Sequence, residues 1–176
     1  MSQPAKLVLL LAALLLGGCG ARPYAEHYQV VIDPTFTDEE SGRIVSALDA
    51  WTTAVGVTFD VVYGTECDGV DDRICVVPAV LRQGLDGLTY RCNQTQGSVV
   101  WLDRIDVGPT GNREWYDYVL RHEFGHALGL LHTQAGTLMY KFIGPDPTIS
   151  CADRQQYWDL RRLTDLGCST QYVLTP

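Results

Sequence analysis

The sequence predicts one α+β domain, and three observations support this fold class. A strand, a helix and a second strand follow one another between residues 28 and 63. Two extended runs joined by a polar turn predict a hairpin over residues 88–102. Two further helical segments follow that hairpin. With 176 residues, of which 46% are hydrophobic, the chain is long enough to close a single apolar core.

The first elements are a strand, a helix and a strand. Tyr28–Asp33 alternates and is rich in β-branched residues, as in a strand. Thr37–Glu40 has the pattern of a capping box and begins a helix that Gly56 ends. The apolar residues of this helix recur on one face: Ile44, Leu48, Trp51 and Val55. Val57–Tyr63 predicts the next strand, and another apolar run follows at Ile74–Val77. A helix between two strands favours parallel pairing.

The second half predicts a hairpin and two helices. Leu88–Cys92 and Ser98–Leu102 are extended runs separated by a polar turn, which indicates an antiparallel pair. A helix is expected over Glu114–Leu128, after a break rich in glycine and proline. A last helix is expected from Ser150, with Asp153 completing its capping pattern, to Leu166, where Gly167 stops it.

The composition is acidic and limits the partners. There are 21 Asp and Glu against 13 Lys and Arg, which gives a formal net charge of -8 and a pI of about 4.8. A nucleic-acid-binding domain normally presents a basic face, so we expect no nucleic-acid partner. We expect a monomer that acts on protein or peptide substrates.

The N-terminal residues have the pattern of an export signal. Lys6 precedes an apolar run, Leu7–Leu16, that is too short to span a bilayer comfortably. The sequence Leu-Gly-Gly-Cys that ends at Cys19 resembles the bacterial lipobox, in which the cysteine receives lipid and becomes the new N-terminus. Gly20 stands where an inner-membrane retention signal usually has Asp. The alternative is a cleaved secretory signal in which Cys19 is incidental.

These patterns predict three segments. Residues 1–18 would form a lipoprotein signal peptide, residues 19–27 a tether, and residues 28–176 the folded domain. The protein would be exported and anchored to the bacterial cell envelope by lipid on Cys19, in the outer membrane of a two-membrane cell.

Export makes the remaining cysteines candidates for disulfides. Cys67 and Cys75 enclose a short polar loop and are the easiest pair to bridge. If a helix joins Cys151 to Cys168, roughly 17 residues separate them by about 25 Å, far beyond the limit of about 7 Å for a disulfide. Cys92 is therefore expected to pair with one of these two or to stay free.

One segment has the pattern of a catalytic metal site. His122 and His126 are four residues apart within a predicted helix, so both imidazoles lie on the same face. Gly129 can end the helix in the left-handed conformation and bring His132 back as a third ligand. Three imidazoles leave the fourth tetrahedral position of a zinc ion open, which is typical of catalytic sites. Glu123 is placed to act as general base towards an attacking water.

One alternative applies to the three motif histidines, and the fourth histidine of the chain is interpreted separately. The pattern could arise by chance among ordinary helix histidines, but Gly129 and His132 must then coincide with it as well. His27, the fourth histidine, stands alone near the tether and is interpreted as a surface residue.

The extended motif resembles that of the metzincin metallopeptidases and, among them, the matrixins. The resemblance rests on three segments, His122–His132, Thr137–Tyr140 and Ala47–Trp51 leading into Val57–Phe59. It covers most of the chain from Tyr28 to Leu166. It implies a metzincin-type five-stranded mixed, twisted sheet with three helices, and a Met-turn in which Met139 forms an apolar floor below the zinc ligands. Ordinary core packing of Met139 is compatible with that role.

Residues beside the motifs favour matrixins within the metzincins. Astacins have Glu and adamalysins Asp after the third histidine, whereas this chain has Thr133, close to the matrixin Ser. Lys141 stands where astacins and serralysins have a zinc-binding Tyr. In matrixins, the residue matching Tyr140 lines the pocket for the substrate residue after the cut. The residue matching Tyr118 sets the depth of that pocket, although a core role for Tyr118 is an equal alternative.

Other matrixin features are absent from the sequence. There is no Pro-Arg-Cys-Gly propeptide switch, and the histidines of a structural zinc site are missing, so we expect one zinc. Asp68, Asp71 and Asp72 could bind Ca²⁺, but their spacing fits no known calcium loop, and a solvated acidic loop is favoured.

The sequence thus predicts a zinc-dependent endopeptidase with Glu123 as general base and acid. A peptide substrate would add to the sheet edge near Leu88–Cys92. One alternative is a surface binding or adhesion lipoprotein that keeps a zinc-stabilised fold but does not cleave. Another is a hydrolase of small amides, for which an exposed edge strand would have no purpose.

Overall fold

The computed structural model describes most of the predicted domain. The described residues are 26–66, 73–81, 86–91, 97–103, 113–142 and 148–161. Several predictions therefore fall outside them: the signal peptide, Cys19, most of the tether, the acidic residues of the possible calcium loop, and Cys67, Cys92 and Cys168. Among the described residues, no helix combines the length and apolar composition needed to cross a membrane.

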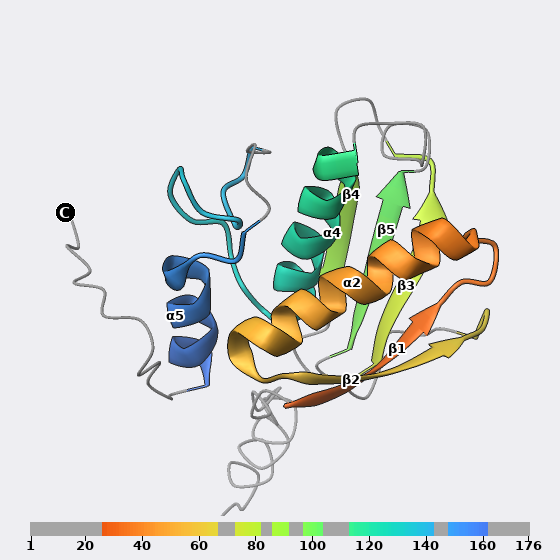
Figure 1. Ribbon diagram of the computed structural model, residues 1–176, viewed down its shortest axis with the longest axis horizontal. Helices are drawn as coiled ribbons and strands as arrows, with labels where there is room; N and C mark the ends of the chain where they lie inside the picture. The colour runs from red at the N-terminus through yellow and green to blue at the C-terminus, as the bar shows by residue number, and fades with distance from the viewer. Residues whose placement is uncertain are drawn as a thin grey trace, which may run out of the picture.

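The described strands form one mixed sheet of five strands in the order β2-β1-β3-β5-β4 (Figure 1). All neighbouring pairs are parallel except β4 with β5, which is antiparallel. Both the crossover pairing of the first two strands and the hairpin are confirmed. The strands are β1 (His27–Ile32), β2 (Thr58–Tyr63), β3 (Arg73–Ala79), β4 (Gly87–Arg91) and β5 (Ser98–Asp103).

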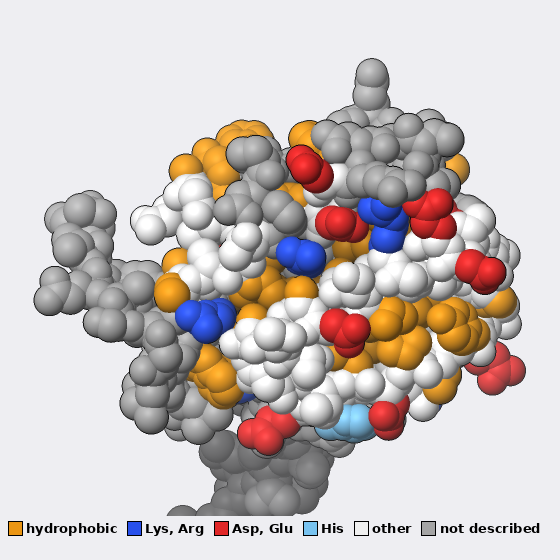
Figure 2. Space-filling view, in the orientation of Figure 1, with side chains coloured by type: hydrophobic (Ala, Val, Ile, Leu, Met, Phe, Trp, Pro, Cys, Tyr) orange, Lys and Arg blue, Asp and Glu red, His pale blue; other side chains and the backbone are white. Residues whose placement is uncertain are grey.

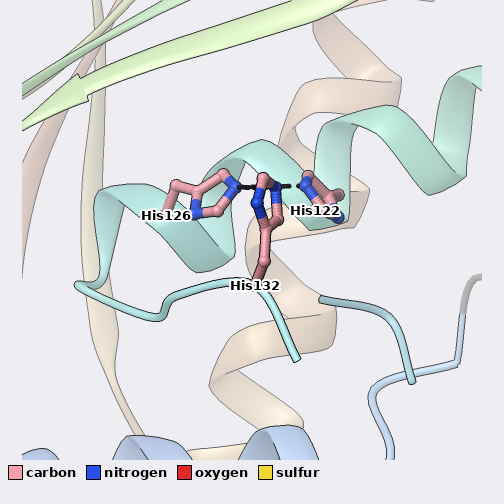
Figure 3. A group of neighbouring side chains, drawn as sticks. All are labelled: His122, His126 and His132. Atoms are coloured by element: carbon pink, nitrogen blue, oxygen red, sulfur yellow. Dashed lines mark hydrogen bonds between the residues drawn. The ribbon is translucent and has the colours of Figure 1, made fainter. Parts of the chain in front are cut away.

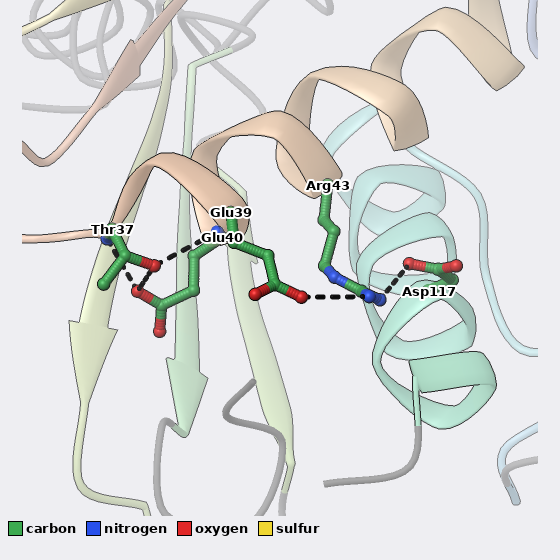
Figure 4. Close-up of polar contacts among 5 residues, drawn as sticks. All are labelled: Thr37, Glu39, Glu40, Arg43 and Asp117. Carbon is green, nitrogen blue, oxygen red and sulfur yellow. Dashed lines mark hydrogen bonds and ion pairs between the residues drawn. The ribbon is translucent and has the colours of Figure 1, made fainter. Parts of the chain in front are cut away.

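Helix α2 (Asp38–Val55) makes the crossover from β1 to β2. It begins with the predicted capping box: the Thr37 hydroxyl accepts from the amide of Glu40, and the Glu40 carboxylate accepts from the amide of Thr37 at 2.7 Å (Figure 4). It ends at Gly56, whose φ of 76° is left-handed. Capping at both ends fixes where the crossover turns back towards the sheet.

Helix α4 (Arg113–Ala127) packs with α2 over one face of the sheet (Figure 1). Trp51 of α2 is completely buried, and its indole N–H donates to the carbonyl of Arg121 at 2.9 Å. Arg43 also links the helices through Asp117 at 3.2 Å and contacts Glu39 (Figure 4). The buried tryptophan should contribute more to this contact than Arg43 does, because partly exposed ion pairs add little stability.

Helix α5 (Cys151–Leu160) is shorter than predicted. Ser150 caps it as expected, with Asp153 completing the capping box. However, the helix ends at Leu160, with Arg161 as its C-cap, rather than at Leu166. The predicted separation of Cys151 from Cys168 assumed a continuous helix. Cys151 itself is a thiol outside any disulfide, and its sulfur accepts from the Arg154 guanidinium at 3.1 Å.

Of the two cysteines in the described ranges, Cys75 is held in a disulfide and Cys151 is not. Cys75 is completely buried and disulfide-bonded. Its predicted partner, Cys67, lies outside the described residues, so the pairing stays a prediction.

Candidate metal centre

The last two turns of α4 and the segment after it bring the three predicted histidines together. His122 and His126 lie one turn apart on α4. Gly129 has a φ of 98°, the left-handed conformation predicted for it, and its amide donates to the carbonyl of His126 at 2.9 Å. The chain then turns back beside α4 (Figure 1) and places His132 against the other two imidazoles.

The three side chains converge through one kind of atom. Nε2 of His126 lies 3.1 Å from Nε2 of His122 and 3.2 Å from Nε2 of His132 (Figure 3). Two nitrogens bound to one tetrahedral zinc at 2.0 to 2.1 Å are about 3.3 Å apart. The spacing therefore fits a shared zinc ion. Among the described residues, this triad is the group of His, Cys, Asp and Glu side chains arranged to hold a metal.

Backbone carbonyls fix the tautomers of two ligands. A carbonyl can only accept, so Nδ1 of His122 donates to the oxygen of Leu138, and Nδ1 of His126 to that of Leu130, both at 2.8 Å. The Nε2 lone pairs are then directed to the shared point. Burial lowers the pKa of His122, and it lowers that of His126 to about 4. Both imidazoles are thus neutral at pH 7, the form that binds metal.

Met139 packs against the helical turn that carries the ligands. It is completely buried. A Cβ built on Gly125 would clash with the Met139 sulfur and would lie 3.1 Å from Cζ2 of Trp51. Only glycine at position 125 lets the Met-turn approach α4 this closely. The predicted role of Met139 as a floor below zinc stays a prediction.

We expect Gly125→Ala to destabilise the protein by about 2 kcal/mol, because overpacking outweighs the helical preference for alanine. Gly42→Ala is the matched control, since Gly42 also lies within a helix but its Cβ position has no atom within 4 Å apart from its chain neighbours and the backbone of the helix itself. That change should stabilise by up to about 1 kcal/mol. Urea unfolding measures both, and equal effects of the two substitutions would contradict the packing argument.

Asp153 ties the Met-turn to α5. Its buried carboxylate accepts from the amides of Leu138 at 3.0 Å and Met139 at 3.1 Å, and from the amide and hydroxyl of Ser150. The carbonyl of Leu138 in turn holds His122. The cap of α5 is therefore connected to a metal ligand through one residue of the Met-turn.

Asp153→Asn should lower the free energy of unfolding by about 3 kcal/mol, since an amide NH₂ cannot accept from the buried N–H donors that face it. Asp159→Asn, at an exposed site of the same helix, should change stability little. Denaturant titration of both variants checks this expectation. A similar loss for both would show that the Met-turn contacts contribute little.

The two predicted pocket tyrosines lie close to the site. Tyr118 is 1% exposed, stacks on His122 with ring centroids 5.9 Å apart, and donates from its hydroxyl to the carbonyl of Leu138 at 2.8 Å. These contacts give it a supporting role for His122. Tyr140 is half-buried, and both tyrosines line the same cleft. Their effect on substrate choice stays a prediction.

Glu123 lies beside the histidines without joining their cluster. It is 7% exposed, and its Oε2 accepts from the hydroxyl of Thr89 at 2.6 Å. Burial raises the pKa of Glu123 to about 7, while the bond from Thr89 lowers it. A carboxyl group with a pKa near 7 can both accept and return a proton at neutral pH.

A cleft of about 1080 Å³ runs past the triad. One wall is the edge strand β4 with Asp86, and another is the segment Tyr140–Phe142. On the face shown in Figure 2, the described Lys and Arg side chains lie apart from one another and form no continuous basic patch. The cleft is large enough for several residues of an extended peptide.

Similar structures support the fold. No protein-family profile matches the chain, and no curated protein matches its sequence. Archaemetzincin from Methanopyrus kandleri has a TM-score of 0.57 at 13% identity, over 80% of this chain and 98% of its own. Two structures of myroilysin have TM-scores of 0.54 and 0.56, also at 13% identity, over 78% and 81% of this chain and 93% and 86% of their own. The chain therefore has a metzincin-like fold that carries a three-histidine metal site consistent with catalytic zinc, with Glu123 beside it.

Proposed function

We propose that this protein is a zinc-dependent endopeptidase. The observation that carries the proposal is the convergence of three imidazole Nε2 atoms next to the buried carboxyl group of Glu123. A purely structural zinc site does not need such a carboxylate, and structural sites usually use four protein ligands. The cleft past these groups supplies room for a substrate.

The residues of the chain divide the chemistry among them. His122, His126 and His132 would hold the zinc, which when bound polarises the scissile carbonyl and makes water more acidic. Glu123 accepts a proton from the water while the water oxygen attacks the carbonyl carbon. It then donates that proton to the amine nitrogen as the C–N bond breaks, so the carboxylate is regenerated.

The edge strand is the proposed binding surface for the peptide. β4 is the last strand of the sheet. Among the described strands it pairs with β5 alone, so its other edge faces no strand. An extended substrate could therefore add to the free edge of β4 by main-chain hydrogen bonds and pass the triad in the cleft. Tyr118 and Tyr140 would then line the pocket for the residue after the cut, as in the matrixins that the sequence resembles.

The proposal extends to the location of the enzyme. The lipobox-like sequence supports lipid attachment at Cys19 and anchoring to the cell envelope, where an oxidising environment allows the predicted Cys67–Cys75 disulfide. Mass spectrometry of the mature protein would detect the lipid on Cys19. An unmodified N-terminus after a different cleavage site would favour an ordinary secreted enzyme.

Chelator-sensitive cleavage tests the proposed activity. The purified protein should cleave unfolded casein, lose this activity with 1,10-phenanthroline and regain it with zinc. An extended peptide should be cleaved far faster than a dipeptide, which separates an endopeptidase from a hydrolase of small amides. A zinc-loaded protein that binds casein without cutting it would instead indicate the non-cleaving adhesion function.

A further inference from the structure

The edge strand β4 also faces α4, the helix that carries His122, Glu123 and His126. Residues at positions 87, 89 and 91 alternate with the exposed Leu88 and Tyr90, and they point towards α4. Arg91 donates to the carbonyl of Ala127 at 3.1 Å, and Thr89 contacts Glu123. One face of the strand is thus occupied by contacts with the helix that carries the metal ligands.

Thr89 contacts Glu123 at two atoms. Its Oγ1 lies 2.6 Å from Oε2 of the carboxylate and 3.1 Å from the backbone oxygen of the same residue. The hydroxyl has one proton, and the shorter contact with a carboxylate is the stronger hydrogen bond. The bond fixes the direction of a side chain that has several staggered rotamers available.

Gly87 confines the same side chain from another direction. A Cβ at this position would lie 2.6 Å from Cγ of Glu123 and 3.0 Å from both its Cδ and Oε1. The clash would be with the stem of the side chain, so a small shift of the carboxylate tip could not relieve it. The glutamate therefore fills space that only glycine at position 87 leaves open.

We propose that Gly87 and Thr89 are positioning residues that hold the Glu123 carboxylate for proton transfer. This inference rests on the proposed function. It means that one strand has two tasks, since its outer edge would bind the peptide while its inner face aims the general base. The five residues of β4 would then determine both where the substrate binds and where the Glu123 carboxylate lies.

Steady-state kinetics of three variants on an extended peptide test this inference. Thr89→Val keeps the β-branched shape but removes the hydroxyl, and kcat should fall by about 10- to 100-fold with KM changed by less than about twofold. Thr89→Ser restores the donor and should keep kcat within about threefold of wild type. Gly87→Ala should lower kcat in the same way as Thr89→Val. Zinc content should stay unchanged in all three.

Thr58→Val is the matched control. Thr58 lies on β2 at the opposite edge of the sheet, where its hydroxyl contacts the carbonyl of Glu26 at 3.3 Å. This variant should have wild-type kcat. A uniform loss in Thr58→Val and Thr89→Val would show a general effect of removing a strand hydroxyl and would overturn the proposal.

A double-mutant cycle adds a measurement that does not depend on activity. In zinc-free protein, Thr89→Val should lower the folding equilibrium constant about tenfold more when Glu123 is present than in a Glu123→Ala background. If the effects of Thr89→Val and Glu123→Ala on the folding equilibrium are additive, Thr89 does not hold Glu123 and the proposal is overturned. If wild type cleaves peptides and Thr89→Val cleaves them equally well, only this inference fails. If zinc-loaded wild type cleaves no peptide, the proposed function fails and this inference fails with it.

Discussion

Glu123→Gln should bind one zinc per chain yet lose nearly all peptide hydrolysis, by a factor of about 10² to 10⁴. Glutamine keeps the shape of the side chain and can still accept from the Thr89 hydroxyl, so the local structure should persist. It cannot accept the proton from water or return it to the leaving amine. Because the change affects the reaction rather than binding, kcat should fall while KM stays similar.

The measurement compares kcat, KM and zinc content in the same preparations of wild type and Glu123→Gln. Glu39→Gln is a suitable control, since Glu39 lies at the start of α2 and contacts Arg43 away from the cleft. Full peptidase activity in a zinc-replete Glu123→Gln protein would reject Glu123 as the general base.

His126→Ala should abolish both zinc retention and activity. His126 Nε2 is the central atom of the triad, with contacts of 3.1 and 3.2 Å to the other two ligand atoms. Its removal leaves two imidazoles, which hold zinc much more weakly than three. We expect zinc content after dialysis to fall from about one per chain to near zero, and cleavage to fall below detection.

His27→Ala is the matched histidine control for this experiment. His27 lies on β1 and contacts Thr58 and Asp60 at the surface, outside the triad. Its variant should keep both zinc and activity. Retention of one zinc by His126→Ala would place the metal elsewhere in the chain.

The fold could be predicted largely because its signals are local. The capping box at Thr37 and Glu40, the left-handed Gly56 and the alternating strands depend on residues close together in the sequence. The two ligands on α4 follow from helical periodicity alone. The pairing of β3 between β1 and β5 is different, since it depends on contacts distant in sequence, and only the resemblance to metzincins implied a five-stranded sheet.

Contacts around Glu123 could not be predicted in the same way. The alternation in β4 indicates two faces but not which residue of α4 lies opposite Thr89, because that depends on how helix and sheet pack. The glycine at position 125 is a signal of close packing that can be seen in the sequence. Glycine within a helix costs about 1 kcal/mol relative to alanine, which indicates a packing reason such as the contact with Met139. The sequence predicts Asp153 as the residue that completes the capping box begun by Ser150, but its bonds to the Met-turn depend on tertiary structure.

Cleavage profiling of the purified protein on a peptide library, with zinc content determined on the same sample, tests the central claim most directly. A zinc endopeptidase should contain one zinc per chain, cut within extended peptides, and lose cleavage in proportion to zinc removed by a chelator. Full zinc occupancy without cleavage of any peptide, or cleavage that persists after zinc is removed, would contradict it.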